Sequence, residues 1–192
     1  MKIRTAIKKG SKILENSNIS SFKLDSELLM SRVLNKKRDY IILNDKEKLS
    51  NNALKNYQNL IKERQKGKPI AYITGKKEFW KFEFDINQNV LIPRPDTELI
   101  VEEILKLTKN KSQLKVLDIG TGSGCIILSI LKERKGFYGV GIDKSKKCVE
   151  MSRVNSNKLN VTKRIKFFKS DVDNFSYGKY DLVISNPPYI NK

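Results

Sequence analysis

Histidine is absent from this chain, and cysteine occurs only twice, as Cys125 and Cys148. Without histidine there is no imidazole base for a Ser-His-Asp type of catalytic triad, and without a Cys-x-x-Cys pair the usual zinc sites are excluded. Two isolated cysteines are typical of a reducing compartment rather than of a disulfide framework. We therefore expect chemistry that needs neither an imidazole nor a metal ion.

Long apolar runs are also missing. The most apolar stretch, around residues 125–131, is far too short to span a bilayer. The first residues, Met1-Lys2-Ile3-Arg4, lack the apolar centre of a signal peptide. We expect a soluble, cytoplasmic protein with no membrane partner.

Acidic residues are scarce relative to basic ones. The chain has 39 Lys and Arg against 21 Asp and Glu, a net charge of +18. Such a balance suggests a polyanionic partner, such as nucleic acid or a ribonucleoprotein surface. Compositional bias is the other explanation, because Lys, Asn and Ile are frequent everywhere and the lysines are spread along the chain rather than gathered on one face. We favour the bias.

The first third of the chain has the apolar spacing of helices. Residues 3–66 read as several short helices with polar connectors. Ser50 or Asn51 can cap the last of them, and Gly67 with Pro69 ends it. A small helical bundle of this kind binds or positions a partner but carries no visible chemistry.

A period-2 pattern follows the bundle. Apolar and polar residues alternate over 80–86, which predicts a strand with one buried face. The turn Gly75-Lys76-Lys77 is expected to pair it with residues 70–74 in a hairpin. We place the domain boundary after this hairpin. The expected domains are 1–88, helical with a β-hairpin linker, and 89–192.

The second domain alternates strands and helices. Pro93 and Pro95 hold its first segment extended, and Asp96 or Thr97 can cap a helix after it. Apolar runs then predict strands at 116–119, 138–142, 165–168 and 181–185, separated by helical segments. This rhythm is typical of a parallel sheet with crossover helices, an α/β Rossmann-like fold.

A glycine-rich turn separates the first of these strands from its helix. The turn is Gly120-Thr121-Gly122-Ser123-Gly124, and Cys125 stands where a dinucleotide-binding fingerprint would have its third glycine. Backbone N–H groups at such a turn favour the anionic end of a ligand. The spacing argues against NAD and for S-adenosyl-L-methionine, whose carboxylate takes the place of a pyrophosphate.

Acidic residues at the next two strand tips complete a cofactor site. Asp143 lies 143 − 124 = 19 residues after Gly124, where ribose hydroxyls need acceptors. Asp171 and Val172 follow the third strand, at the position that the adenine would reach.

The last strand runs into Asn186-Pro187-Pro188-Tyr189. The prolines end the strand, because neither can donate to a β-ladder. The Asn186 side-chain oxygen and the Pro187 carbonyl can then accept from a planar NH2 group, with Tyr189 packed against it. Held beside a sulfonium methyl group, that nitrogen is positioned for direct displacement. Asn186, Pro187 and Tyr189 are the candidate catalytic residues, Pro188 completes the substrate site, and Asn186 also adjoins the cofactor.

The order of motifs resembles the HemK/PrmC family, the glutamine N5-methyltransferases of peptide-chain release factors. The resemblance rests on five stretches: Pro69–Gly75 with Glu78-Phe79-Trp80, Leu91–Glu98, Asp118–Gly124, Asp143, and Ser185–Tyr189. Asn-Pro-Pro-Tyr is shared with DNA adenine methyltransferases, whereas Ile-Pro-Arg-Pro-Asp-Thr-Glu behind a helical domain is specific.

The resemblance implies a substrate and a partner. The substrate would be the glutamine of the Gly-Gly-Gln loop of a class I release factor, which the N-terminal domain would help to dock. No nucleic acid is required directly, and we expect a monomer. Some members of the family carry an aromatic residue just after the third-strand Asp, where this chain has Val172.

The end of the chain departs from the family. Members continue for several strands and helices beyond the point that corresponds to Lys192, so we expect a fragment or a truncated gene product with residues 182–184 in an exposed, apolar edge strand. Two alternatives stay open beside the release-factor enzyme. One is a nucleic-acid adenine N6-methyltransferase, and the other is an inactive remnant that only binds the cofactor or the release factor.

Overall fold

The computed structural model describes residues 1–187. The chain divides into two compact units, Met1–Gly75 and Lys76–Lys192. No helix within the described residues is long and apolar enough to cross a membrane. The division lies before the boundary expected at residue 88, because the hairpin buries Phe79 and Phe84 in the core of the second unit.

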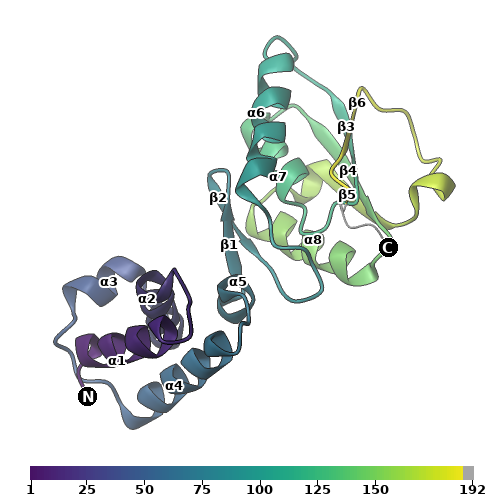
Figure 1. Cartoon of the computed structure of the whole chain (residues 1–192). Helices are drawn as coiled ribbons and strands as arrows, with labels where there is room; N and C mark the ends of the chain where they lie inside the picture. The colour runs from purple at the N-terminus through teal and green to yellow at the C-terminus, as the bar shows by residue number, and fades with distance from the viewer. Residues whose placement is uncertain (188–192) are drawn as a thin grey trace. The chain divides into compact units, whose positions relative to one another are not determined.

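The first unit is a bundle of short helices (Figure 1). Its helices are α1 (Ile3–Glu15), α2 (Phe22–Leu34), α3 (Arg38–Leu43), α4 (Asn51–Gln65) and α5 (Ile70–Thr74). Ser50 caps α4 as expected, its hydroxyl accepting from the Ala53 N–H at 3.1 Å. Arg64 of α4 donates to the buried carboxylate of Asp25 on α2 at 2.6 Å, and this ion pair joins the two helices.

The hairpin differs from the prediction in its strands and its turn. Residues 70–74 form helix α5, not a strand, and Gly75 ends that helix with a left-handed φ of 76°. The strands are β1 (Lys76–Phe79) and β2 (Phe82–Asp85), paired antiparallel. The turn is Trp80-Lys81, with Trp80 at φ 58°. Gly75 is therefore a helix C-cap, a role that period-2 reasoning does not consider.

The second unit contains the expected parallel sheet. Its strands are β3 (Lys115–Ile119), β4 (Tyr138–Asp143), β5 (Ile165–Lys169) and β6 (Leu182–Ser185). They lie in the order β5-β4-β3-β6, and every neighbouring pair is parallel. The connecting segments carry the helices α6 (Glu98–Leu107), α7 (Cys125–Glu133) and α8 (Lys146–Lys158) and the short 3-10 turns η1 (Pro95–Thr97), η2 (Thr162–Arg164) and η3 (Val172–Asn174).

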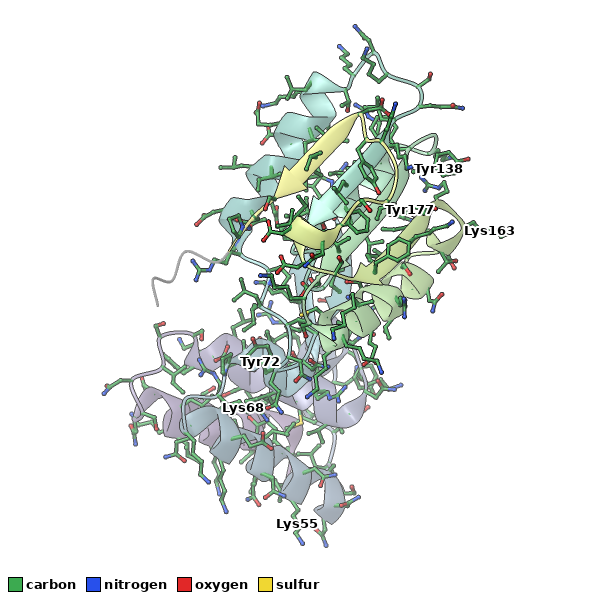
Figure 2. All side chains as sticks on the ribbon, turned by 90° about the vertical axis from the view of Figure 1, so that its right-hand side faces the viewer. Lys55, Lys68, Tyr72, Tyr138, Lys163 and Tyr177 are labelled. Atoms are coloured by element: carbon green, nitrogen blue, oxygen red, sulfur yellow. The ribbon has the colours of Figure 1, made fainter. Side chains whose placement is uncertain are left out.

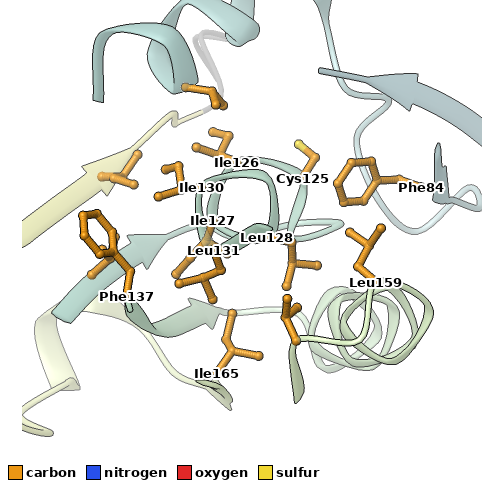
Figure 3. Close-up of a cluster of buried hydrophobic side chains, with 14 of the residues drawn as sticks. Phe84, Cys125, Ile126, Ile127, Leu128, Ile130, Leu131, Phe137, Leu159 and Ile165 are labelled. Carbon is orange, nitrogen blue, oxygen red and sulfur yellow. The ribbon is translucent and has the colours of Figure 1, made fainter. Parts of the chain in front are cut away.

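One face of the sheet is packed against the helices. Helix α7 is buried along most of its length, and Figure 3 shows its Ile127, Ile130 and Leu131 in one apolar cluster with Phe137 and Ile165. Apolar residues of α6 and α8, among them Val101 and Val149, belong to the same core. Burial of this apolar surface is what fixes the strand tips relative to one another.

The opposite face of the sheet is covered differently. Leu117, Val140 and Ile142 are buried there beneath Phe175 and Tyr180, from the segment that follows β5. β6 pairs only with β3 among the described strands, and its Val183 is 55% exposed. Ile184, on the helical face, is buried. The expected exposure of strand 182–184 therefore holds for Val183 but not for Ile184.

Gly10 tests the packing of the first unit. A Cβ at this position of α1 would collide with the hydroxyl of Tyr57 and lie 2.9 Å from Cδ1 of Ile61. We expect Gly10→Ala to lower the free energy of unfolding by about 1–3 kcal/mol, although alanine favours a helix by about 1 kcal/mol. Urea unfolding followed by circular dichroism measures the change.

Two control variants accompany Gly10→Ala. Tyr57→Phe removes the colliding hydroxyl. The loss of stability caused by Gly10→Ala should therefore be smaller in a Tyr57→Phe protein than in the wild type. Lys9→Ala, exposed on the same helix, should change the stability by less than about 0.5 kcal/mol. A Gly10→Ala protein as stable as the wild type would contradict the packing described.

Candidate functional site

Among the described residues, the predicted site residues meet at the carboxyl edge of the parallel sheet. Gly120 follows β3, Asp143 ends β4, Asp171 follows β5 and Asn186 follows β6. In the sheet, β4 and β5 lie on one side of β3, and β6 lies on the other side. Ligands of open α/β sheets bind beside such a reversal of strand order. The glycine-rich turn and Asn186 flank the reversal.

The three glycines of the turn have different roles. Gly120, Gly122 and Gly124 all have positive φ, at 73°, 56° and 79°. A Cβ at Gly120 would meet nothing within 4 Å, and one at Gly122 only the Gly120 carbonyl at 3.9 Å. A Cβ at Gly124 would lie 2.9 Å from Cδ1 of Leu128 on α7. The first two glycines thus leave open space at the turn, while the third lets α7 pack closely.

Side chains of helix α8 hold the glycine turn by donating hydrogen bonds to the carbonyl groups of the turn. The Ser152 hydroxyl donates to the Gly122 carbonyl at 2.8 Å, and the Asn155 amide donates to the Ser123 carbonyl at 2.9 Å. The motifs of the sequence do not single out Ser152 or Asn155. The available signal is their spacing, since two polar residues lie one helical turn apart on the side of α8 that is buried.

Asp143 holds the turn from the next strand. One carboxylate oxygen accepts from the Gly122 N–H at 3.0 Å, and the other accepts from the Ser145 N–H at 2.8 Å. Its side chain is half-buried. Asp143 therefore shapes the glycine turn itself, in addition to the role at a ribose that the sequence predicts.

Asp118, another acid of this region, is not among the predicted site residues. It lies in β3, is 1% exposed, and accepts from the Thr121 hydroxyl at 2.7 Å. Burial raises the pKa of Asp118 to about 6, with the nearby Asp143 charge adding to the effect and the Thr121 hydrogen bond opposing it. The chemical signal for Asp118 is a carboxylate inside an otherwise apolar strand.

Asp171 and Val172 lie beyond β5. Lys144 donates to one oxygen of Asp171 at 2.7 Å and holds the pKa of that carboxyl below its usual value. The other oxygen is buried and has no partner among the described residues. Val172 is 48% exposed at the start of η3. A carboxylate beside an exposed apolar side chain suits the edge of a heterocycle.

Asn186 is tied to a distant segment of the second unit. Its side-chain amide nitrogen donates to the Thr97 hydroxyl oxygen at 3.3 Å. Thr97 makes no side-chain capping bond to α6, contrary to the expectation for Asp96 or Thr97, because the 3-10 turn η1 leads directly into that helix. Pro187 is exposed, and Pro188 and Tyr189 lie outside the described residues.

Comparison with known proteins identifies the family. A model described as the PrmC N-terminal domain matches residues 5–75, and one described as the methyltransferase small domain matches residues 95–192. The release factor glutamine methyltransferase of Buchnera aphidicola (subsp. Acyrthosiphon pisum) is 40% identical over 192 residues, which are 100% of this chain and 68% of the relative. The chain belongs to the release factor glutamine methyltransferase family.

Other relatives agree. The release factor glutamine methyltransferase of Clostridium acetobutylicum is 40% identical over 195 residues, with 100% of this chain and 68% of the relative covered. That of Leptospira interrogans is 41% identical over 193 residues, with 98% and 67% covered. The expected Rossmann-like methyltransferase fold behind a helical domain is confirmed, and the expected cofactor, S-adenosyl-L-methionine, agrees with membership in this family.

Asp118 gives this family member a pH-dependent stability. Its folded pKa lies above the ordinary value of 3.8, so ionisation of the buried carboxylate destabilises the fold. The destabilisation is absent below about pH 4, grows as the pH rises toward 6, and is complete above it. Asp118→Asn keeps an acceptor for Thr121 without the charge. We expect the variant to be more stable than the wild type by up to about 3 kcal/mol at pH 7.5.

The measurement is the difference in the free energy of unfolding between Asp118→Asn and the wild type, by urea denaturation from pH 4 to 8. Asn174→Ala, at an exposed position of η3, is the control, and its difference should not change with pH because neither residue carries a titrating side chain. An equally flat difference for Asp118→Asn would show that burial does not raise the pKa of Asp118.

Proposed function

We propose that the chain transfers a methyl group from S-adenosyl-L-methionine to the side-chain nitrogen, N5, of the glutamine in the Gly-Gly-Gln loop of a class I release factor. The observation that carries the proposal is the hydrogen bond between Asn186 and Thr97. It joins the Asn-Pro-Pro-Tyr stretch to the Ile-Pro-Arg-Pro-Asp-Thr-Glu segment. The release factor glutamine methyltransferases that the chain resembles along its full length support the same reaction.

The cofactor fits the described part of the site. The open space beside Gly120 and Gly122 admits the carboxylate end of the cofactor, and the N-terminus of α7 favours its negative charge. Asp143 would accept from the ribose hydroxyls. The carboxylate of Asp171 and the exposed Val172 would adjoin the adenine. When bound, the cofactor supplies an electrophilic methyl group on sulfur.

The reaction then depends on how the chain holds the substrate amide. The Asn186 side-chain oxygen and the Pro187 carbonyl would accept from the glutamine NH2, fixing its nitrogen lone pair toward the methyl group. Pro188 and Tyr189 would complete the substrate site. Such catalysis works by positioning and electrostatics, and it needs no side chain that takes up a proton in the step itself.

The N-terminal unit would dock the release factor. Ile42 and Leu43 at the end of α3 are 52% and 83% exposed, and adjacent exposed apolar side chains are typical of a surface that a protein partner covers. The family model described as the PrmC N-terminal domain covers residues 5–75 of this unit.

The first test offers the purified chain two substrates with labelled cofactor. We expect one methyl group on the Gly-Gly-Gln glutamine of a class I release factor, located by mass spectrometry, and none on a release factor in which that glutamine is alanine. Methylation of adenine in DNA without methylation of the release factor would identify the rival nucleic-acid enzyme. Cofactor binding without turnover on either substrate would identify a binding remnant.

Asp143→Ala tests the cofactor site. The substitution removes the predicted ribose acceptor and the partner of the Gly122 N–H together. We expect the affinity for S-adenosyl-L-homocysteine, measured by isothermal titration calorimetry, to fall at least tenfold, since the variant cannot make two hydrogen bonds that involve a charged group. Asp173→Ala, exposed on η3, should bind like the wild type. Equal affinities for all three proteins would refute the assignment.

Thr97→Val tests the positioning of Asn186. Valine has nearly the shape of threonine but cannot accept the hydrogen bond from the Asn186 amide. We expect the maximal rate of methyl transfer to fall roughly tenfold to hundredfold, with unchanged affinity for S-adenosyl-L-homocysteine. Thr97→Ser keeps the hydroxyl and should retain most of the rate. If Thr97→Val turned over like the wild type, the bond would have no positioning role.

A further inference from the structure

The parallel sheet gathers basic residues at its amino edge, opposite the glycine turn. The segments that enter the strands all begin at this edge, because the strands run in one direction. Six exposed lysines lie in these segments or at the start of a strand, and none has a carboxylate partner among the described residues: Lys109, Lys111, Lys135, Lys163, Lys166 and Lys179. These lysines are scattered along the sequence, but the fold brings them to one edge of the sheet.

A cavity opens at the same edge. Its volume is about 680 Å³, and it lies between the first residues of β3, β4 and β5. Lys115, Lys163, Arg164 and Lys166 line it, against Asp181 as the single acid of the lining. Asp181 is partly engaged, since it accepts from the Lys115 backbone N–H at 2.7 Å. The cavity therefore carries a net positive charge.

Arg164 builds the cavity wall rather than offering its charge to a ligand. Its guanidinium donates to the backbone carbonyls of Leu131, Arg134 and Phe137 at 2.6–3.0 Å. These bonds fix the turn before β5 against the turn before β4. The cationic groups that remain available to a ligand are the lysine ammonium groups.

Exposed aromatic rings stand among these lysines. Tyr138 is 53% and Tyr177 48% exposed, and both line the cavity with Lys163, as Figure 2 shows for the three labelled side chains on one flank of the sheet. The Lys115 ammonium lies 5.6 Å from the Tyr177 ring centroid, and that of Lys166 lies 5.8 Å from it. Sites for single-stranded nucleic acid combine lysines that contact the phosphates with aromatic rings on which the bases stack.

We propose that the amino edge of the sheet binds single-stranded nucleic acid. Its phosphates would contact Lys163, Lys166 and the neighbouring lysines, and a base would stack on Tyr138. This surface is separate from the methyl-transfer site, because the five residues of β3 place roughly 15 Å between the two edges. Binding here needs neither the cofactor nor the release factor, so it does not depend on the proposed function.

The test uses fluorescence anisotropy with a labelled twelve-nucleotide oligouridine RNA, the same length of DNA, and anionic phosphatidylserine vesicles. We expect Lys163→Glu/Lys166→Glu to weaken RNA binding at least tenfold. The slope of log affinity against log salt should fall by about 1.4, or about 0.7 for each phosphate that a lysine no longer neutralises. Lys9→Glu/Lys55→Glu changes the net charge equally from exposed sites of the first unit and should stay within twofold of the wild type.

Tyr138 separates stacking from charge. Tyr138→Ala should weaken RNA binding at least fivefold, while Tyr138→Phe, which keeps the ring, should bind like the wild type. Comparable RNA and DNA affinities would fit recognition of phosphate and base alone, and tighter RNA binding would indicate further contacts to the 2′-hydroxyls.

Equally weakened binding by the two double variants would overturn the proposal, because diffuse charge would explain the binding. Vesicle binding without oligonucleotide binding would overturn it as well.

Discussion

The glycine turn after β3 depends on side-chain hydrogen bonds that hold a left-handed backbone in place. Asp143 accepts from the Gly122 N–H, Asp118 accepts from the Thr121 hydroxyl, and Ser152 donates to the Gly122 carbonyl. These bonds come from β3, β4 and α8, so the turn has its shape only when the sheet and its helical layer are assembled. The proposed placement of a cofactor at the turn therefore depends on the packing of the second unit.

Strand direction then places different groups at the two edges of the sheet. The carboxyl edge of the sheet carries Asp143, Asp171 and Asn186, which are acceptors for hydroxyl and amide groups. The amino edge carries lysines and exposed tyrosines. A parallel sheet sends every strand tip to one edge and every strand start to the other. A basic surface and a polar ligand site can therefore coexist in one unit without competing for the same ligand.

Local patterns predict most of the second unit and fail at the hairpin. Continuous apolar runs locate all four parallel strands to within a residue or so. Residues 70–74 resemble a strand because they are apolar and precede a glycine, but five residues cannot show a helical period. The left-handed Gly75 ends the helix, and the turn at Trp80 sets the register of the hairpin. Both depend on backbone angles that composition does not encode.

Local residue patterns are enough to predict the elements of the candidate site: a glycine turn after one strand, acids after the next two, and Asn186 after the last. Each of these elements can be recognised from residues close together in the chain. Because the strands are parallel, all of the elements lie at the same edge of the sheet. Which of these groups touch depends on the packing of the folded chain. Thr97 meets Asn186 across 89 positions, and Asn155 of α8 bonds to Ser123 in the glycine turn. Such contacts depend on how whole elements pack against one another, which no local pattern records.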